Sequence, residues 1–285
     1  MFHPVDTRFP AAVENEVDAI CAAMFPAGDR GFVRRAFGWV TECFAGRFAD
    51  YRPIDTGYHD FEHTMQGTLC LAQLLQGRHA ARAAPVLTLD WFRLGLFAIL
   101  FHDSGYLKHG DDREGTGAKY TPTHVDRSTV FAREFLSGHG IVDADIRAVQ
   151  NMIRCTGINM DLAAIPFASE VERTVGFALG TADLIGQMAA PDYVEKLPVL
   201  YQEFAEAARF DATHLPPEFA FGSADALMRH TPAFWNEYVK PKIDVGFGGL
   251  HAFLRDPWPD GPNFYLQRIE DNIARLRRTL AMPPG

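Results

Sequence analysis

The chain has 285 residues, a net charge of -9, and 47% hydrophobic and 12% aromatic residues. This length permits a substantial hydrophobic core, in one large domain or two small ones. The negative charge and the lack of a Lys/Arg-rich block argue against a nucleic-acid polymer as partner, because binding its backbone requires clustered positive charge. The chain opens without a signal-peptide core and no stretch approaches 18 uninterrupted apolar residues, so we expect a cytoplasmic protein that does not enter a membrane.

Helical periodicity dominates the sequence, and strand-like alternation is scarce. Along the chain, the pattern predicts a polar loop over 104–122 and helices over 11–25, 31–50, 58–76, 89–102, 123–137, 143–155 and 169–190. Ser169 and Glu172 form a capping-box signal at the start of the last of these helices. Thr231-Pro232 predicts the N-cap and first residue of a later helix, and the final helix is expected over 264–280.

These elements predict an all-α helical bundle. We expect N-terminal helices over 1–50, a core over 51–190, and a C-terminal helical extension over 191–285 that packs on the same domain. None of the four cysteines forms a CxxC pair and each lies in a helical or apolar context, which indicates buried, reduced thiols. They are Cys21, Cys43, Cys70 and Cys155.

Histidines and aspartates follow one another in the order H…HD…D. His102 and Asp103 end the apolar run 91–101, where a carboxylate needs a cation or strong donors beside it. Adjacent residues lie about 100° apart on a helix, so both can face one point only where the helix ends, which Gly105 permits. With His63 and Asp183 they make a set of two histidines and two carboxylates. Such a site suits Zn, Mn, Fe or Mg, and open positions on the metal indicate catalysis through a coordinated water.

Three segments carry a family resemblance. Tyr58-His59-Asp60-Phe61-Glu62-His63 is similar to the Y-H-N-x-x-H segment of cyclic-nucleotide phosphodiesterases, although Asp60 stands where those enzymes usually have Asn. Phe101-His102-Asp103-Ser104-Gly105-Tyr106 resembles their H-D segment, and Thr181-Ala182-Asp183-Leu184 resembles their later Asp segment. Over roughly residues 50–190 the chain therefore resembles the HD-domain metal-dependent phosphohydrolase superfamily, with the helical fold of that superfamily.

The resemblance implies that His63, His102, Asp103 and Asp183 bind a divalent metal ion, and that Asp103 bridges to a second one. It also implies that His59 donates a proton to the leaving oxygen, a role that suits an imidazole one turn from a ligand. His124 matches one of two further histidines found in dinuclear members, whereas no histidine stands near Cys155-Thr156. We therefore predict one firmly held metal ion and a second, water-rich one.

Other residues are weaker candidates. Lys119 is a candidate phosphate contact, although a surface role fits it as well, while Tyr58 and Gln187 are candidate substrate contacts. The aromatic group Phe234, Trp235 and Tyr238 is more typical of a core than of a stacking platform.

The predicted function is hydrolysis of a small phosphorylated substrate by metal-activated water, with a phosphodiester favoured and a cyclic nucleotide as one candidate. Alternatives are an HD-fold di-iron oxygenase, which needs the additional histidines, and a non-catalytic ligand-binding module. A homodimer is compatible with the sequence.

Overall fold

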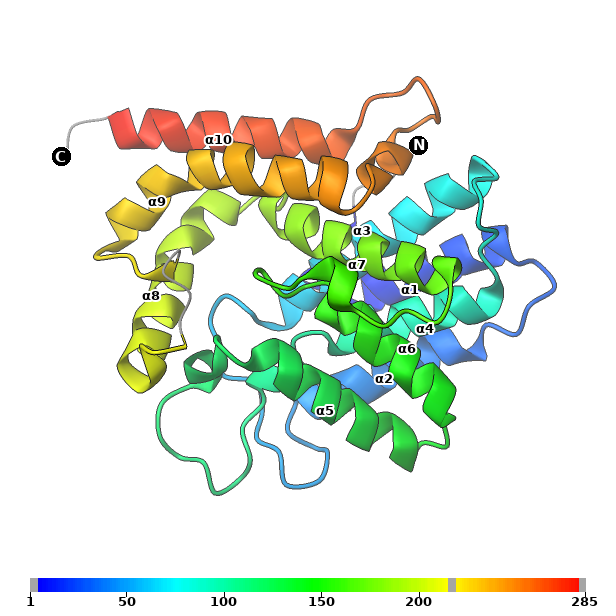
Figure 1. Ribbon diagram of the computed structural model, residues 1–285, viewed down its shortest axis with the longest axis horizontal. Helices are drawn as coiled ribbons and strands as arrows, with labels where there is room; N and C mark the ends of the chain where they lie inside the picture. Colours follow the sequence, from blue (N-terminus) through cyan, green and yellow to red (C-terminus); the bar gives the residue numbers. More distant parts are fainter. Residues whose placement is uncertain (1–4, 215–218, 282–285) are drawn as a thin grey trace.

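The computed structural model describes residues 5–214 and 219–281, and within these ranges the chain forms helices and no β-strand (Figure 1). Two isolated bridges, Tyr51 with His109 and Arg255 with Asn263, are the extent of β-pairing there. The prediction of an all-α fold is confirmed. No described helix is both long and apolar enough to cross a membrane. The α-helices are α1 (Pro10–Met24), α2 (Gly31–Phe44), α3 (Phe61–Ala80), α4 (Leu89–Phe101), α5 (His124–Gly138), α6 (Asp143–Arg154), α7 (Glu170–Met188), α8 (Tyr193–Asp211), α9 (Ala224–Ala233) and α10 (Phe264–Ala281).

Shorter helical turns lie between these helices. The 3-10 turns η1 (Ser104–Tyr106) and η2 (Gly117–Tyr120) occupy the predicted polar loop, and η3 (Leu162–Ala164) precedes α7. After α9 the helix widens into two π-helical stretches, η5 (Phe234–Val239) and η6 (Lys242–Gly246), and the 3-10 turn η7 (Leu250–Leu254) follows.

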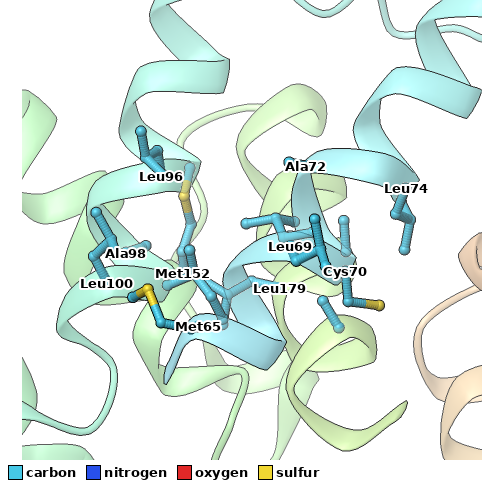
Figure 2. Close-up of a cluster of buried hydrophobic side chains, with 14 of the residues drawn as sticks. Met65, Leu69, Cys70, Ala72, Leu74, Leu96, Ala98, Leu100, Met152 and Leu179 are labelled. Atoms are coloured by element: carbon cyan, nitrogen blue, oxygen red, sulfur yellow. The ribbon is translucent and has the colours of Figure 1, made fainter. Parts of the chain in front are cut away.

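Helices α3, α4, α6 and α7 build the centre of the molecule, where their apolar side chains meet (Figure 2). Every residue of α4 from Leu94 to Phe101 is buried, as its uniformly apolar sequence predicts. Helices α3 and α7 approach each other closely through Gly186, because a Cβ atom there would lie 3.0 Å from the backbone oxygen of Gln66. This close approach brings His63 on α3 toward Asp183 on α7.

Helix α2 ends at Phe44, six residues before the predicted end. Gly46 adopts a left-handed conformation with φ of 69°. Its N–H donates to the Cys43 carbonyl, and the Arg47 N–H donates to the Glu42 carbonyl, which is the Schellman pattern that closes a helix. A Cβ at Gly46 would lie 2.4 Å from the nitrogen of Pro53, so the turn also requires glycine for space.

Two predicted helix starts are wrong. Helix α3 begins at Phe61 and not at Tyr58, because the Asp60 carboxylate accepts the His63 N–H at 2.9 Å and caps the helix. Helix α9 begins after Ser223, whose hydroxyl accepts the Ala226 N–H, and so the predicted Thr231-Pro232 start lies inside it. Thr231 donates its hydroxyl to the Leu227 carbonyl, a bond typical of a helix interior.

The segment after residue 190 packs back on the central helices, with α10 along one edge of the molecule (Figure 1). The Asn272 amide donates to the carbonyls of Met188 and Ala190, and the Tyr265 hydroxyl donates to Gln73 on α3. Four cysteines are free and buried, as predicted.

Candidate metal centre

Four side chains from α3, α7 and the C-terminal end of α4 converge on one point. His63 Nε2 lies 3.2 Å from Asp103 Oδ2 and 3.2 Å from Asp183 Oδ1, and His102 Nε2 lies 3.3 Å from each of the same two oxygens. The contacts thus form a closed ring in which histidine and aspartate alternate. We call these four residues the ligand ring. All four are buried.

The end of α4 explains how two adjacent residues enter one ring. His102 keeps helical backbone angles as the C-cap, whereas Asp103 turns away with φ of -106° and ψ of 9°. The Ser104 hydroxyl donates to the Phe101 carbonyl, and the Gly105 N–H donates to the Ser128 hydroxyl on α5. Gly105 is required here because a Cβ would lie 2.0 Å from the His124 carbonyl oxygen.

The donor atoms fit a divalent metal ion. The carbonyl of Ile99 accepts the proton on His102 Nδ1 at 2.7 Å, which leaves the Nε2 lone pair facing the ring. His102 Nε2, Asp103 Oδ2 and Asp183 Oδ1 are buried and have no hydrogen-bond partner among the described residues. Ligands bound at about 2.1 Å lie roughly 3.0–3.5 Å from their neighbours, which is the spacing observed. His63, His102 and Asp103 meet the geometric requirements of a metal group on their own.

When no metal is bound, the same arrangement of side chains favours the protonated form of His63. Burial disfavours the charged form of His63, but Asp103 and Asp183 outweigh burial and raise its pKa to about 10. Burial would raise the pKa values of Asp103 and Asp183, but His102 and His63 reverse this effect and lower both. A metal ion must displace these protons, so binding is expected to release them.

A small cavity of about 10 Å³ lies behind His63, the size of one water molecule. Its lining includes Gln66, Asp192 and Lys196. His63 Nδ1, Gln66 Nε2 and Asp192 Oδ1 are buried without a hydrogen-bond partner in the described chain. A water molecule there would connect the outer nitrogen of His63 to these groups, as ligating histidines usually require.

His59 lies beside the ring and is held by Glu203, which sequence analysis did not identify. His59 Nδ1 is 2.6 Å from Glu203 Oε2, and because a carboxylate only accepts, Nδ1 carries the proton. Glu203 Oε1 accepts the N–H groups of Tyr58 and His59 at 2.7 and 3.3 Å. His59 precedes α3, so Glu203 on α8, and not helix α3, orients its ring. The Glu203 side chain is 4% exposed and that of His59 is 15% exposed.

His124 stands on the other side of Asp103. Its Nε2 lies 3.9 Å from Asp103 Oδ1, the oxygen outside the ring, and its Nδ1 is 2.7 Å from the Thr121 carbonyl. Burial lowers the pKa of His124 and favours the neutral imidazole that a metal would need. Tyr106 stacks on both His59 and His124, with ring centroids 4.8 and 4.7 Å apart.

A cavity of about 350 Å³ opens from the ring. His59, His63, Asp103 and Asp183 line one part of it, together with Tyr58 and Gln187. The Tyr58 hydroxyl donates to Gln187 at 2.8 Å. Of the three aromatic residues that were expected in the core, Trp235 is buried, whereas Phe234 and Tyr238 line the cavity.

Lys119 does not line this cavity. It pairs with Asp112 and donates to the Glu114 carbonyl within its own loop. The lysine that does line the cavity is Lys242, which sequence analysis did not single out.

Comparison with known proteins identifies a family. No curated protein matches the chain. Residues 111–253 match the model of the Npun_R2479-like family. The matched segment contains His124, Asp183 and Glu203, whereas His63 and the His102-Asp103 pair precede it. Because the match spans half of the 285 residues, the chain belongs to the Npun_R2479-like family.

Proposed function

We propose that this protein is a metal-dependent phosphohydrolase that acts on a small phosphate ester, with a phosphodiester favoured and a cyclic nucleotide as one candidate. The observation that carries the proposal is the ligand ring, which opens on a cavity beside a histidine held by a buried carboxylate. The likeness to HD-domain phosphohydrolases rests on the same residues. A closed structural zinc site would favour sulfur ligands, which the ring lacks.

Each site residue has a separate role in the proposed hydrolysis. His63, His102, Asp103 and Asp183 would hold a divalent ion such as Zn, Mn, Mg or Fe. Such an ion supplies positive charge to the phosphate oxygens and lowers the pKa of a coordinated water. His59 donates a proton from Nε2 to the leaving oxygen as the P–O bond breaks. Glu203 accepts the hydrogen bond from His59 Nδ1 and keeps the imidazole in place.

The second position, beside His124, bears on the choice between hydrolysis and oxygenation. His124 and Asp103 Oδ1 offer two donors there, but Cys155 and Thr156 line the cavity where a further histidine would be needed. Burial raises the pKa of the Cys155 thiol, which makes it a poor ligand. This donor set favours a hydrolase with a weak second metal over a di-iron oxygenase.

Hydrolysis of bis(p-nitrophenyl) phosphate and p-nitrophenyl phosphate tests the proposal. Protein stripped with a chelator is reloaded with Mn, Mg, Zn or Fe(II), its bound metal is quantified, and release of p-nitrophenolate is followed. We expect activity with at least one metal, and its loss in Asp103→Ala. Asp225→Ala is the control, because Asp225 is exposed and pairs with Arg229 on α9. Wild-type activity in Asp103→Ala with metal still bound, or no activity with any metal, would overturn the proposal.

A further inference from the structure

Lys242 differs from every other lysine of the chain. The sequence contains five lysines, and four of them pair with a carboxylate. Lys242 has no carboxylate within 4.0 Å among residues 5–214 and 219–281, in a protein whose net charge is -9. The paired lysines and their partners are Lys108 with Asp55, Lys119 with Asp112, Lys196 with Asp60 and Glu62, and Lys240 with Glu270.

The position of Lys242 in the fold directs it into the cavity. Phe234, Tyr238 and Lys242 recur at four-residue spacing along η5 and η6, and all three line the cavity. π-helical turns are rare and occur frequently at functional sites. Lys242 is the one lysine or arginine in the described cavity lining.

The surroundings of Lys242 are aromatic. Its Nζ lies 6.0 Å from the ring centroid of Tyr238 and 5.5 Å from that of Phe247. Phe247 packs on α7 at Gly180, one turn before Asp183, where a Cβ would lie 2.5 Å from its ring. We call the aromatic side chains that line this part of the cavity the aromatic wall: Phe204, Phe219, Phe221, Phe234, Tyr238 and Phe247. Lys242 lies at this wall, and among the described residues it forms no ion pair with the aspartates of the ligand ring.

This environment favours binding of an anion. The side chain is half-buried, and burial lowers the pKa of the ammonium group. A partly desolvated charge without a counter-ion is costly, and an anionic ligand group would remove that cost through a charge-assisted hydrogen bond. The aromatic rings beside it suit a flat apolar body.

We propose that Lys242 is a specificity-determining residue that binds a second anionic group of the substrate. The ligand class is a small molecule with an aromatic body that carries a carboxylate or phosphate group apart from the ester at the ligand ring. The cavity of about 350 Å³ lies within the usual range for such ligands. The inference depends on the proposed function in one respect: it assumes that the reacting ester binds at the end of the cavity next to the ligand ring.

Calorimetric binding to chelator-treated protein tests this role without any need for catalysis. The probes are a naphthoate, a naphthyl phosphate and the neutral naphthamide of the same shape. We expect at least one anion to bind the wild type about tenfold more tightly than the amide, the scale of one charge-assisted hydrogen bond. Whichever anion shows the preference distinguishes a carboxylate ligand from a phosphate.

Substitutions at Lys242 test whether its ammonium group causes the preference for anions. Lys242→Met should bind both anions no better than the amide, and unchanged amide binding would show that its cavity is intact. Lys242→Arg should retain the preference, and so should the control Lys240→Met, since Lys240 pairs with Glu270 and does not line the cavity. No anion preference in the wild type, or its persistence in Lys242→Met, would overturn the inference. If the preference holds but no phosphate ester is hydrolysed, the proposed function fails and the binding role of Lys242 stands.

Discussion

Replacing Glu203 by glutamine tests how His59 acts. In Glu203→Gln the amide oxygen can still accept the N–H groups of Tyr58 and His59, so the local backbone should keep its course. The amide NH2 then faces His59 Nδ1, where the carboxylate accepts the Nδ1–H hydrogen bond at 2.6 Å in the wild type. Because an amide nitrogen only donates, Nδ1 must become an acceptor, and the ring can no longer carry protons on both nitrogens.

The expected loss depends on the leaving group. A positioned general acid contributes roughly 10²–10⁴-fold, or about 3–5 kcal/mol, when the leaving oxygen must be protonated. Ethyl phenyl phosphate requires this proton much more than ethyl p-nitrophenyl phosphate, whose leaving group is stable as an anion. We therefore expect kcat of Glu203→Gln to fall about 10²-fold or more on the phenyl ester, and by less than about tenfold on the nitrophenyl ester.

The assay compares kcat for both esters with bound metal measured in parallel. Glu203 contacts none of the four ligand-ring residues through a hydrogen bond or ion pair within the described chain, so metal content should stay at the wild-type level. Equal losses on the two esters would refute the reasoning, because a distorted site would slow both alike. A loss of metal together with activity would also refute it.

Further predictions concern the ring, the helix contacts and the thiols. A metal ion at 100 times its Kd should stabilise the wild type by about 2.7 kcal/mol, seen as a rise in Tm. His102→Ala should abolish this rise, whereas His214→Ala, at an exposed residue paired with Asp211, should keep it; an equal rise in His102→Ala would argue against the ring. Gly186→Ala should lower both the free energy of unfolding and metal affinity by pushing α3 from α7, whereas Gly38→Ala, with nothing within 4 Å, should raise stability by up to about 1 kcal/mol through helix propensity. Urea denaturation would measure both, and the same sign for the two variants would contradict the packing argument. Burial raises the pKa of the Cys21 and Cys43 thiols to about 11 and about 12, so the unfolded chain loses these protons first and the free energy of unfolding should fall as pH rises above about 9. Denaturation at pH about 8 and about 10 should show a smaller fall in the double variant Cys21→Ala, Cys43→Ala, and an identical fall in both proteins would count against this origin.

Local signals in the sequence predicted the helices well and their ends less well. The Ser169 cap of α7 is correct, because its hydroxyl accepts the Glu172 N–H at 3.2 Å. Asp60 departs from the family motif, but Asp is also a favoured N-cap residue, and its cap places the start of α3 at Phe61, three residues after the predicted start at Tyr58. Thr231-Pro232 resembles a helix start, but the competing Ser223 cap eight residues before Thr231 includes both residues in one helix.

Residues that meet across the fold were predictable only in part. His63, His102, Asp103 and Asp183 could be grouped because unpaired polar residues on apolar helices require partners. Glu203 gave no such signal, since it lies in an ordinary helical stretch 144 residues after His59. The sequence also could not tell which of Lys119 and Lys242 lines the cavity. Lys119 is paired with Asp112 and Lys242 has no such partner among the described residues, and this difference arises only when the chain folds.

The two ends of the cavity come from different parts of the sequence, and this has an evolutionary consequence. The last residue of the ligand ring in the sequence is Asp183, whereas the aromatic wall, from Phe204 to Phe247, comes from later residues. Substitutions in the aromatic wall can therefore change which molecules fit the cavity without altering the ligand ring. Related proteins that keep the ligand ring could therefore come to bind different molecules through substitutions on α8, α9 and the π-helical stretches alone.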